Sequence, residues 1–192
     1  MTRKLIVQMQ ISVDGFVEAE GDQPWQVWSW GPDCPWDPAL QRAFNESFTC
    51  VDCVLLSRPM VEEGYIDHWA RIAARSPEDG TFAFAHRIGK IEKVIATRDA
   101  FRPRWERTRV LTGEHATTVA TLKAEPGADI LTFGGVRFVS GLLARGLVDE
   151  LQLYVNPALV GAGRRLDWPR RGARLLGAAA YECGIVVSRY AL

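Results

Sequence analysis

Two adjacent glycines, Gly134 and Gly135, separate an apolar run at residues 130–133 from an amphipathic segment at residues 136–145. This order predicts a buried strand, a tight turn and then a helix. The first amides of a helix carry free N–H groups and a partial positive charge, and glycine lets a phosphate approach them closely. Arg137 adds a positive charge in the first turn. The pattern suits the pyrophosphate of a nucleotide; tight packing of the strand against the helix is the alternative.

Three other predicted strands end in residues that could serve the same ligand, namely Asp14-Gly15, Ser57-Arg58-Pro59 and Thr97-Arg98. In an open parallel sheet the carboxyl ends of the strands share one edge, and ligands bind there. Arginine binds phosphate through paired hydrogen bonds, so several arginine-bearing strand ends favour a nucleotide over the alternative of solvated surface charges. The GxGxxG and GxxxxGK[ST] patterns are absent, and we expect a nucleotide to be held in another way.

The elements that position these residues alternate between strands and helices. Residues 4–13 have period-two alternation, which predicts a first strand with Leu5, Val7, Met9, Ile11 and Val13 on one face. We expect further strands at residues 51–56, 93–97, 109–112 and 130–133. Helices are expected at residues 38–48, from Ser57 onward, and at 77–89, 114–124 and 136–145. Three strands without intervening helices follow, at 148–155, 174–182 and 184–191. The predicted fold is α/β, with a mixed, mostly parallel sheet and antiparallel C-terminal strands.

Length and composition are those of an ordinary globular protein. The chain has 192 residues, of which 47% are hydrophobic and 24% charged, and this predicts one domain over residues 1–192. The net charge of zero gives no sign of a nucleic-acid partner, and no apolar stretch approaches the roughly 20 residues of a membrane span. The N-terminus lacks the features of a signal peptide, so we expect a cytoplasmic protein. Cys50 and Cys53 have CxxC spacing without a second pair, and we expect free thiols and no metal.

Short motifs occur in the order of a known family over most of the chain. They span residues 12–16, 52–58, 94–98, 131–135, 146–151 and 156–163. In these motifs the chain resembles the reductase domain of the bacterial bifunctional riboflavin-pathway deaminase–reductase and its stand-alone relatives. The resemblance implies a dihydrofolate-reductase-like fold with three α/β/α layers, NADPH as the cofactor and a small heterocyclic substrate. A homodimer through the C-terminal strands is also implied.

The resemblance further implies roles for individual residues. The segments that match Ser57-Arg58 and Thr97-Arg98 flank the adenosine 2′-phosphate in this family. Gly134 and Gly135 hold the pyrophosphate together with the helix start at Val136, Arg137 and Phe138, often through a cis peptide bond between the glycines. The match to Asp14-Gly15 borders the nicotinamide and the substrate.

One segment departs from the family pattern. The family has glycine before the arginine and threonine two places after it, whereas this chain has Ser57 and Met60 there. Pro59 also removes a backbone donor. The preference for NADPH over NADH is therefore open.

The proton donor has two candidates, Asp14 at a strand end and Glu46 on the helix at residues 38–48. The alternatives are a turn-forming aspartate and a solvated helix face. We expect the substrate to contact Gln10, Ser12, Asp14, Gly15 and Trp36. Tryptophans in the stretch 18–37 could stack on a flat heterocycle, with core packing as the alternative.

Two functions of different class fit these observations. The first is an NADPH-dependent reductase of a ribosylaminopyrimidine-like or pterin-like substrate, or dihydrofolate reductase itself. The second is a nucleotide-binding module without turnover. A flavin-dependent protein on a similar sheet is a third possibility, which the phosphate-binding arginines support less well.

Overall fold

The structure is a computed structural model of the 192-residue chain. It describes residues 3–21, 25–26, 36–75 and 80–192. Four of the tryptophans lie in the stretch 18–37, and two of these, Trp28 and Trp30, fall outside the described residues.

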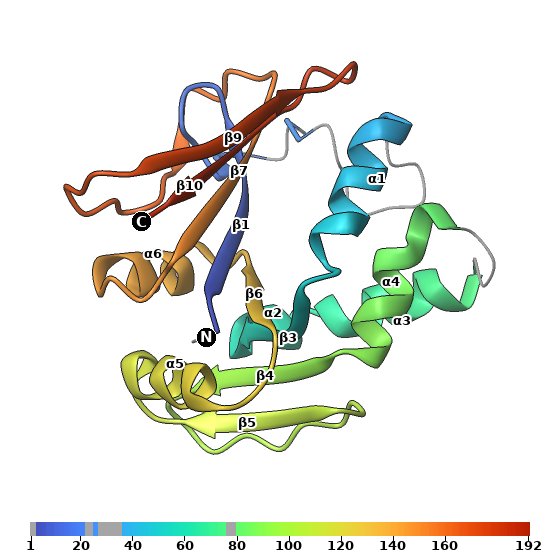
Figure 1. The fold of residues 1–192 in the computed structure, drawn as a ribbon, viewed down its shortest axis with the longest axis vertical. Coiled ribbons are helices and arrows are strands. Elements are labelled where there is room, and N and C mark those ends of the chain that lie inside the picture. Colours follow the sequence, from blue (N-terminus) through green and yellow to red (C-terminus); the bar gives the residue numbers. More distant parts are fainter. Residues whose placement is uncertain (1–2, 22–24, 27–35, 76–79) are drawn as a thin grey trace.

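The centre of the described chain is an eight-stranded sheet (Figure 1). In chain order its strands are β1 (Leu5–Ser12), β3 (Val51–Ser57), β4 (Glu92–Thr97), β5 (Thr108–Thr112), β6 (Asp129–Phe133), β7 (Glu150–Asn156), β9 (Arg174–Ala180) and β10 (Val186–Ala191). Their spatial order is β5-β4-β3-β6-β1-β7-β10-β9. The six strands from β5 to β7 are parallel, and β10 and β9 are antiparallel. The predicted sheet class is therefore confirmed.

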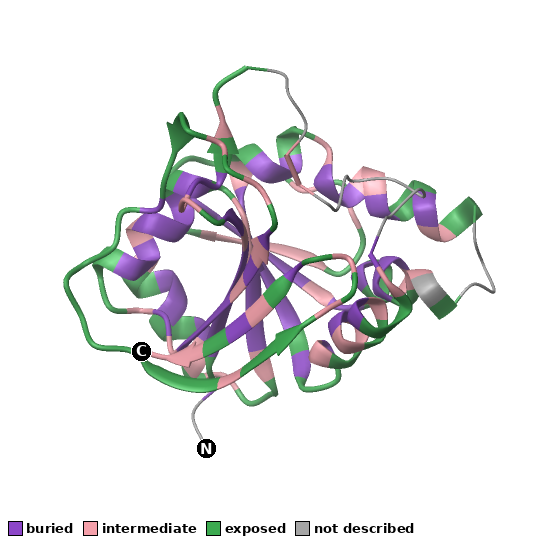
Figure 2. Cartoon of the chain, turned by 90° about the horizontal axis from the view of Figure 1, so that it is seen from above, coloured by how far each residue is buried: buried purple, intermediate pink, exposed green. Residues whose placement is uncertain are grey.

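Helices cover both faces of this sheet (Figure 1). One layer holds α1 (Pro38–Ser47), α2 (Arg58–Glu62), α3 (Tyr65–Arg75), the 3-10 turn η1 (Gly80–Phe82) and α4 (Ala83–Lys90). The other layer holds α5 (His115–Ala124) and α6 (Val136–Ala144). Each layer packs its own apolar cluster against the sheet, and Figure 2 shows the buried residues concentrated in the central strands and on the inward sides of the helices.

Local sequence explains how α1 begins. The side chain of Asp37 accepts a hydrogen bond from the amide of Leu40 at 2.9 Å, and Pro38 occupies the first helical position. Leu40 and Phe44 are one turn apart and buried, so α1 presents one apolar face to the sheet. This packing fixes α1 above β1 and β7.

The first strand differs from its expected pattern at its end. Val13 lies outside β1 and is 61% exposed, because the chain turns after Ser12, where the amide of Gly15 donates to the carbonyl of Ser12. Gln8 and Ser12, on the polar face, are buried. β6 and β7 flank both edges of β1 inside the sheet, and an apolar cluster covers each of its faces.

The helix expected from Ser57 onward is two helices. α2 stops after Glu62, and Gly64 has a φ of 95°, a left-handed conformation that glycine adopts at little cost. α3 then starts at Tyr65. The helix expected at 77–89 begins at Ala83, after η1, and residues 76–79 lie outside the described part. Two short strands, β2 (Glu18–Ala19) and β8 (Gly163–Arg164), pair with each other and were not expected.

Lys93 on β4 closes the C-terminal end of α4. Its ammonium is buried and donates to the carbonyls of Ile88 at 2.9 Å and Ile91 at 3.0 Å. Replacing Lys93 with methionine leaves these carbonyls without a donor, and we expect the free energy of unfolding to fall by about 2–3 kcal/mol. Urea denaturation measures this free energy. As the control, Lys90→Met, at an exposed position on α4, should change the free energy of unfolding by less than about 0.5 kcal/mol. Equal effects of the two substitutions would contradict the prediction.

Candidate cofactor and substrate site

The predicted strand ends lie along one edge of the sheet. β4, β3, β6 and β1 are neighbours and parallel, so their carboxyl ends meet at that edge. Those ends carry Thr97-Arg98, Ser57-Arg58, Gly134-Gly135 and Asp14-Gly15. The edge is therefore the candidate site.

The glycine turn between β6 and α6 is built from two left-handed residues. Gly134 has a φ of 47° and Gly135 a φ of 74°. The peptide bond between them is trans, so the expected cis bond is not found; the two positive φ values turn the chain instead. The amide of Gly134 donates to Sδ of Met9 at 3.1 Å, which ties the turn to β1.

The start of α6 is open to an anion. Gly135 occupies the capping position, and no side chain caps the helix. Arg137 is exposed in the first turn, whereas Phe138 is buried and packs edge-on against the ring of His115. Because its side chain is buried, Phe138 could contact a ligand at this end of the helix only through its backbone amide.

The turn has no room for a larger residue. A Cβ on Gly135 would lie 3.1 Å from Oγ of Ser57, closer than most real Cβ contacts. Gly135 itself is exposed, so its open side is available to a ligand. The uncapped amides, the bare backbone and Arg137 together fit a pyrophosphate group.

Arg58 is held by its own neighbours. Its Nε donates to Glu62 at 2.8 Å, its Nη1 lies 3.9 Å from Asp99, and its guanidinium stacks over the ring of Phe101 at 5.3 Å. The hydrogen bond that Arg58 donates to Glu62 is the main cause that raises the pKa of Arg58. A phosphate that binds Arg58 has to compete with these two carboxylates.

Arg98 is less restrained. Its guanidinium lies 3.5 Å from Glu114, and both side chains are more than 60% exposed, so this ion pair is weak. The hydroxyl of Thr97 is engaged with the backbone of Asp99, at 3.2 Å from both its amide and its carbonyl, and it closes the turn after β4. Of the two arginines beside the predicted 2′-phosphate position, Arg98 is the freer.

A cavity of about 180 Å³ opens beside the glycine turn, and we call it the glycine-turn cavity. Its wall includes Gln10 and Trp36, which were predicted to contact the substrate, and also Gly134, Gly135 and Val136. The indole of Trp36 stacks on Tyr154 with ring centres 5.7 Å apart and planes 5° apart. Ser12, Asp14 and Gly15 lie at the end of β1 and do not line this cavity.

Asp14 ties the end of β1 to the segment after β7. Its carboxylate accepts hydrogen bonds from the hydroxyl of Ser12 at 2.6 Å and from the amides of Val160 and Gly161 at 3.0 and 2.8 Å. The Ser12 hydroxyl, followed by the Val160 amide, lowers the pKa of Asp14 from 3.8 to about 2. A carboxyl that is ionised at neutral pH and bonded in this way does not suit a general acid; the contacts favour the turn-forming alternative.

These contacts predict an acid-sensitive contribution to stability. Because the pKa is lower in the folded chain than in the unfolded chain, the ionised carboxylate stabilises the fold above about pH 4. That contribution is lost as the pH falls from about 4 to 2. We therefore expect Asp14→Asn to be less stable than the wild type at pH 7, with the difference narrowing toward pH 2. Thermal melts of both proteins across this pH range test the prediction, and a stability difference that does not change with pH would contradict it.

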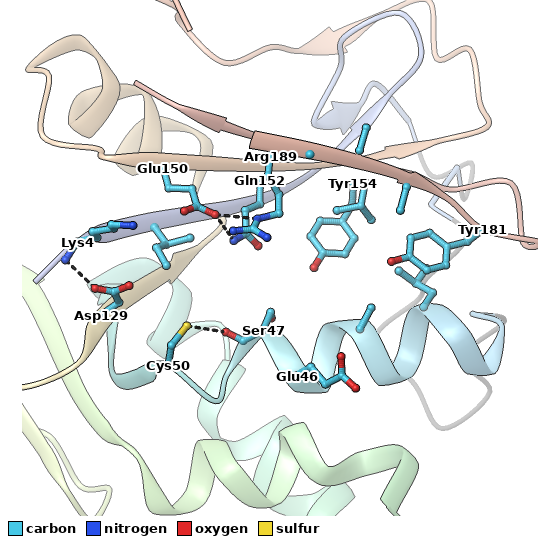
Figure 3. A pocket seen from close by; sticks show the side chains of 17 residues that line it. Lys4, Glu46, Ser47, Cys50, Asp129, Glu150, Gln152, Tyr154, Tyr181 and Arg189 are labelled. Carbon is cyan, nitrogen blue, oxygen red and sulfur yellow. Dashed lines mark hydrogen bonds and ion pairs between the residues drawn. The ribbon is translucent and has the colours of Figure 1, made fainter. Parts of the chain in front are cut away.

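Glu46 lies at a different cavity, of about 570 Å³, between α1 and the strands β7, β9 and β10 (Figure 3). We call it the β9–β10 cavity. Its wall also includes Tyr154, Tyr181 and Arg189. Glu46 does not line the glycine-turn cavity. The structure therefore does not bring this second proton-donor candidate to the turn.

Several further residues of the glycine-turn cavity were not predicted, among them Gln8, Met60 and Tyr154. Gln8 could have been found, because it lies two residues before Gln10 on the same face of β1. Glu18 also lines the cavity, and its carboxylate lies 3.3 Å from Nε of Arg164. The position of Tyr154 depends on β7 pairing with β1, which the sequence pattern does not specify.

Within the described residues, no group of three or more histidine, cysteine or acidic side chains is placed to hold a metal ion. Cys50 is exposed and Cys53 buried, both with free thiols, and burial raises the pKa of Cys53 to about 12. In the same part of the chain, no helix is long and apolar enough to span a membrane.

Known proteins resemble this chain over most of its length. The family model of the RibD C-terminal domain matches residues 3–171. Protein YyaP of Bacillus subtilis is 22% identical over 188 residues, which cover 96% of this chain and 92% of YyaP.

Solved structures share the fold. A putative riboflavin biosynthesis protein from Shewanella sp. PV-4 has a TM-score of 0.64 at 16% identity, covering 100% of this chain and 98% of its own. A pyrimidine reductase-like protein from Corynebacterium diphtheriae has a TM-score of 0.58 at 12% identity, covering 98% and 91%. RibD of Acinetobacter baumannii has a TM-score of 0.61 at 16% identity, covering 99% of this chain and 58% of RibD.

The fold predicted from the motifs is thereby confirmed as dihydrofolate-reductase-like. The family model covers most of the chain, including the glycine turn and the strand ends around it. The chain therefore belongs to the RibD C-terminal domain family, a family of riboflavin-pathway reductases.

Proposed function

We propose that this chain is an NADPH-dependent reductase of a small heterocycle, of ribosylaminopyrimidine-like or pterin-like chemistry. One observation carries the proposal. The uncapped start of α6, which follows Gly134 and Gly135, lies directly beside a cavity with aromatic residues in its wall. A dinucleotide needs an anion site next to a pocket for a flat ring, and the chain offers both at one sheet edge.

Different residues at this edge of the sheet would bind the pyrophosphate, the 2′-phosphate and the substrate ring. The first amides of α6 and the side chain of Arg137 would hold the pyrophosphate, and Arg98, with Arg58 beyond it, would meet the 2′-phosphate. The cofactor supplies a hydride. Gln10, Trp36 and Tyr154 would hold the substrate ring in the glycine-turn cavity. Neither Asp14 nor Glu46 lines this cavity, and the carboxylate of Glu18, which does line it, is paired with Arg164, so we propose that a bound water delivers the proton.

Cofactor titration tests the proposal. NADPH should quench the intrinsic tryptophan fluorescence, because Trp36 lies in the cavity wall. It should do so at lower concentration than NADH, because only NADPH carries the 2′-phosphate that Arg98 would meet. The loss of reduced-nicotinamide absorbance, followed against a panel of aminopyrimidines and pterins, then tests turnover. Binding without turnover across the panel would favour the nucleotide-binding module, and no binding of either cofactor would contradict the proposal.

We also propose a homodimer through the C-terminal strands. β9 forms one edge of the sheet, and its side chains are largely exposed, with Leu175 at 56% and Leu176 at 39%. An apolar edge strand of this kind can pair with another chain. Light scattering should give twice the chain mass for the wild type and the single mass for Leu175→Lys; a monomeric wild type would contradict the proposal.

A further inference from the structure

The β9–β10 cavity is separate from the site proposed for the cofactor. No residue of the glycine turn lines it, and of the residues in the wall of the glycine-turn cavity it shares Tyr154 alone. Leu175 and Leu176, at the proposed dimer contact, do not line it either. Its volume of about 570 Å³ is that of a site for a small organic molecule. The proposed reductase activity therefore gives this cavity no role.

A buried carboxylate with one unused oxygen lies in the cavity wall. Glu150 on β7 is only 4% exposed, and its Oε1 accepts hydrogen bonds from Nε of Arg189 at 3.0 Å and Nε2 of Gln152 at 2.8 Å. Its Oε2 accepts none from the described residues, yet it is not among their fully enclosed unpaired atoms, so solvent reaches it. Because Glu150 lines the β9–β10 cavity, solvent reaches Oε2 through that cavity (Figure 3).

This unequal use of the two oxygens indicates a place for a hydrogen-bond donor. An ionised carboxylate only accepts, and each of its oxygens has two lone pairs. In Glu150 both protein donors go to Oε1, and Oε2 keeps both lone pairs for whatever enters the cavity. Hydrogen bonds between a carboxylate and a charged donor are about twice as strong as neutral ones. A cationic donor therefore gains most at this oxygen.

The other charges of the wall also favour a cation. Three carboxylates line the cavity, those of Glu46, Asp129 and Glu150, against two basic side chains, Lys4 and Arg189. Lys4 is exposed, and the side chain of Arg189 is 52% exposed with its Nε already bonded to Glu150. The buried charge is thus the negative one. An anion that reached Glu150 would meet a like charge, whereas a cation would meet an opposite one.

The rest of the wall suits an apolar or aromatic body. Figure 3 shows Tyr154 and Tyr181 together on the side of the cavity opposite α1. Aromatic rings pack on flat groups and attract cations to their faces. Aliphatic side chains complete the wall, namely Ile6, Leu40 and Val187, and small residues leave the space open, namely Ala43 and residues 177–179. The wall therefore combines one buried acceptor with apolar surface.

We propose that the β9–β10 cavity is a second ligand site, which binds an organic amine whose ammonium donates a hydrogen bond to Oε2 of Glu150. The body of the ligand lies against Tyr154 and Tyr181. A primary ammonium suits the site better than an amidinium or guanidinium, because those planar groups pair with both oxygens of a carboxylate and only one is open here. The inference goes beyond the proposed function and holds whether or not the chain binds NADPH.

The probes are 2-phenylethylamine, which carries an ammonium at neutral pH, and 2-phenylethanol, which has a hydroxyl in its place. Binding is followed by NMR on the ¹⁵N-labelled full chain without cofactor. We expect the wild type to prefer the amine by at least about tenfold, the ratio that a hydrogen bond to a charged group gives. The shifted amides should lie in α1, β7 and the β9–β10 hairpin. A wild type without preference, including one that binds neither probe, overturns the inference.

Two variants of the ion pair should act in opposite directions. Glu150→Gln keeps the shape of the side chain and removes its charge, so the preference for the amine should fall below about threefold. Arg189→Gln removes the competing guanidinium and keeps the carboxylate, so the affinity for the amine should rise several-fold. A merely structural ion pair would make both variants lose affinity alike, and that result contradicts the inference, as does a preference that survives in Glu150→Gln.

A variant that fills the cavity remains decisive where Glu150→Gln does not fold. Gly177 on β9 is paired with Arg189 on β10, so a side chain at 177 projects to the same face as Arg189. No atom lies within 4 Å of a Cβ added there. Gly177→Leu should therefore weaken both probes by more than about tenfold. Ala180→Leu, at an exposed position of the same strand outside the cavity wall, should bind them as the wild type does. Unchanged binding in Gly177→Leu overturns the inference.

Discussion

Replacing Gly135 with valine is expected to weaken the binding of NADPH and NADH alike by more than about 100-fold. A β-branched residue at a φ of 74° is strained by about 1–3 kcal/mol, and its Cβ would lie 3.1 Å from Oγ of Ser57. The valine methyl groups would also cover the first amides of α6, where the pyrophosphate is expected. Fluorescence titration with each cofactor gives the two dissociation constants, and a melting curve shows whether the variant folds.

Gly89→Ala is the matched control. Gly89 lies in α4, its φ is not positive, and no atom lies within 4 Å of an added Cβ. We expect this variant to bind both cofactors as the wild type does, and to be slightly more stable because alanine favours helix. A folded Gly135→Val variant with unchanged cofactor affinity would show that the turn serves packing alone.

Arg98→Ala should weaken NADPH by about 10- to 100-fold and leave NADH within about threefold. The expected loss is that of a charge-assisted hydrogen bond to the 2′-phosphate, which NADH lacks. Arg98 is the relevant residue because its pairing with Glu114 is loose, at 3.5 Å between exposed side chains. Titrations with both cofactors at one salt concentration measure the ratio, and equal losses for the two cofactors would refute the 2′-phosphate role.

The companion variant is Glu62→Gln. It removes the carboxylate that holds Nε of Arg58 at 2.8 Å, so Arg58 becomes available to a phosphate. We expect a several-fold gain in NADPH affinity with no gain for NADH. Identical gains for both cofactors would place Arg58 away from the 2′-phosphate. The serine and proline on either side of Arg58 left the cofactor preference open, and this pair of variants measures it.

Local patterns predicted most of the elements, because they depend on neighbours along the chain. The Asp37-Pro38 start of α1 and the glycine turn before α6 are both local signals, and both elements begin where expected. The break at Gly64 was missed, since a single glycine inside a helical pattern is compatible with a continuous helix until its φ is known.

The roles of the acidic residues could not be predicted in this way. Asp14 is bonded to Val160 and Gly161, whose amides come from a distant part of the chain. Glu46 lies on a predicted helix, but the cavity it faces depends on where β9 and β10 pack. Gln8 donates a hydrogen bond to Gln152 of β7, and nothing in the local alternation of β1 specifies that partner.

The position of β1 between β6 and β7 has a consequence for how the chain folds during synthesis. Leu5 pairs with Ile130 and Ile6 with Glu150, so neither neighbour of the first strand exists until the ribosome has made most of the protein. Until then β1 has two open edges and an apolar sequence, a combination that favours aggregation. Nascent chains stalled before residue 129 should therefore bind chaperones, and release should follow the emergence of β7.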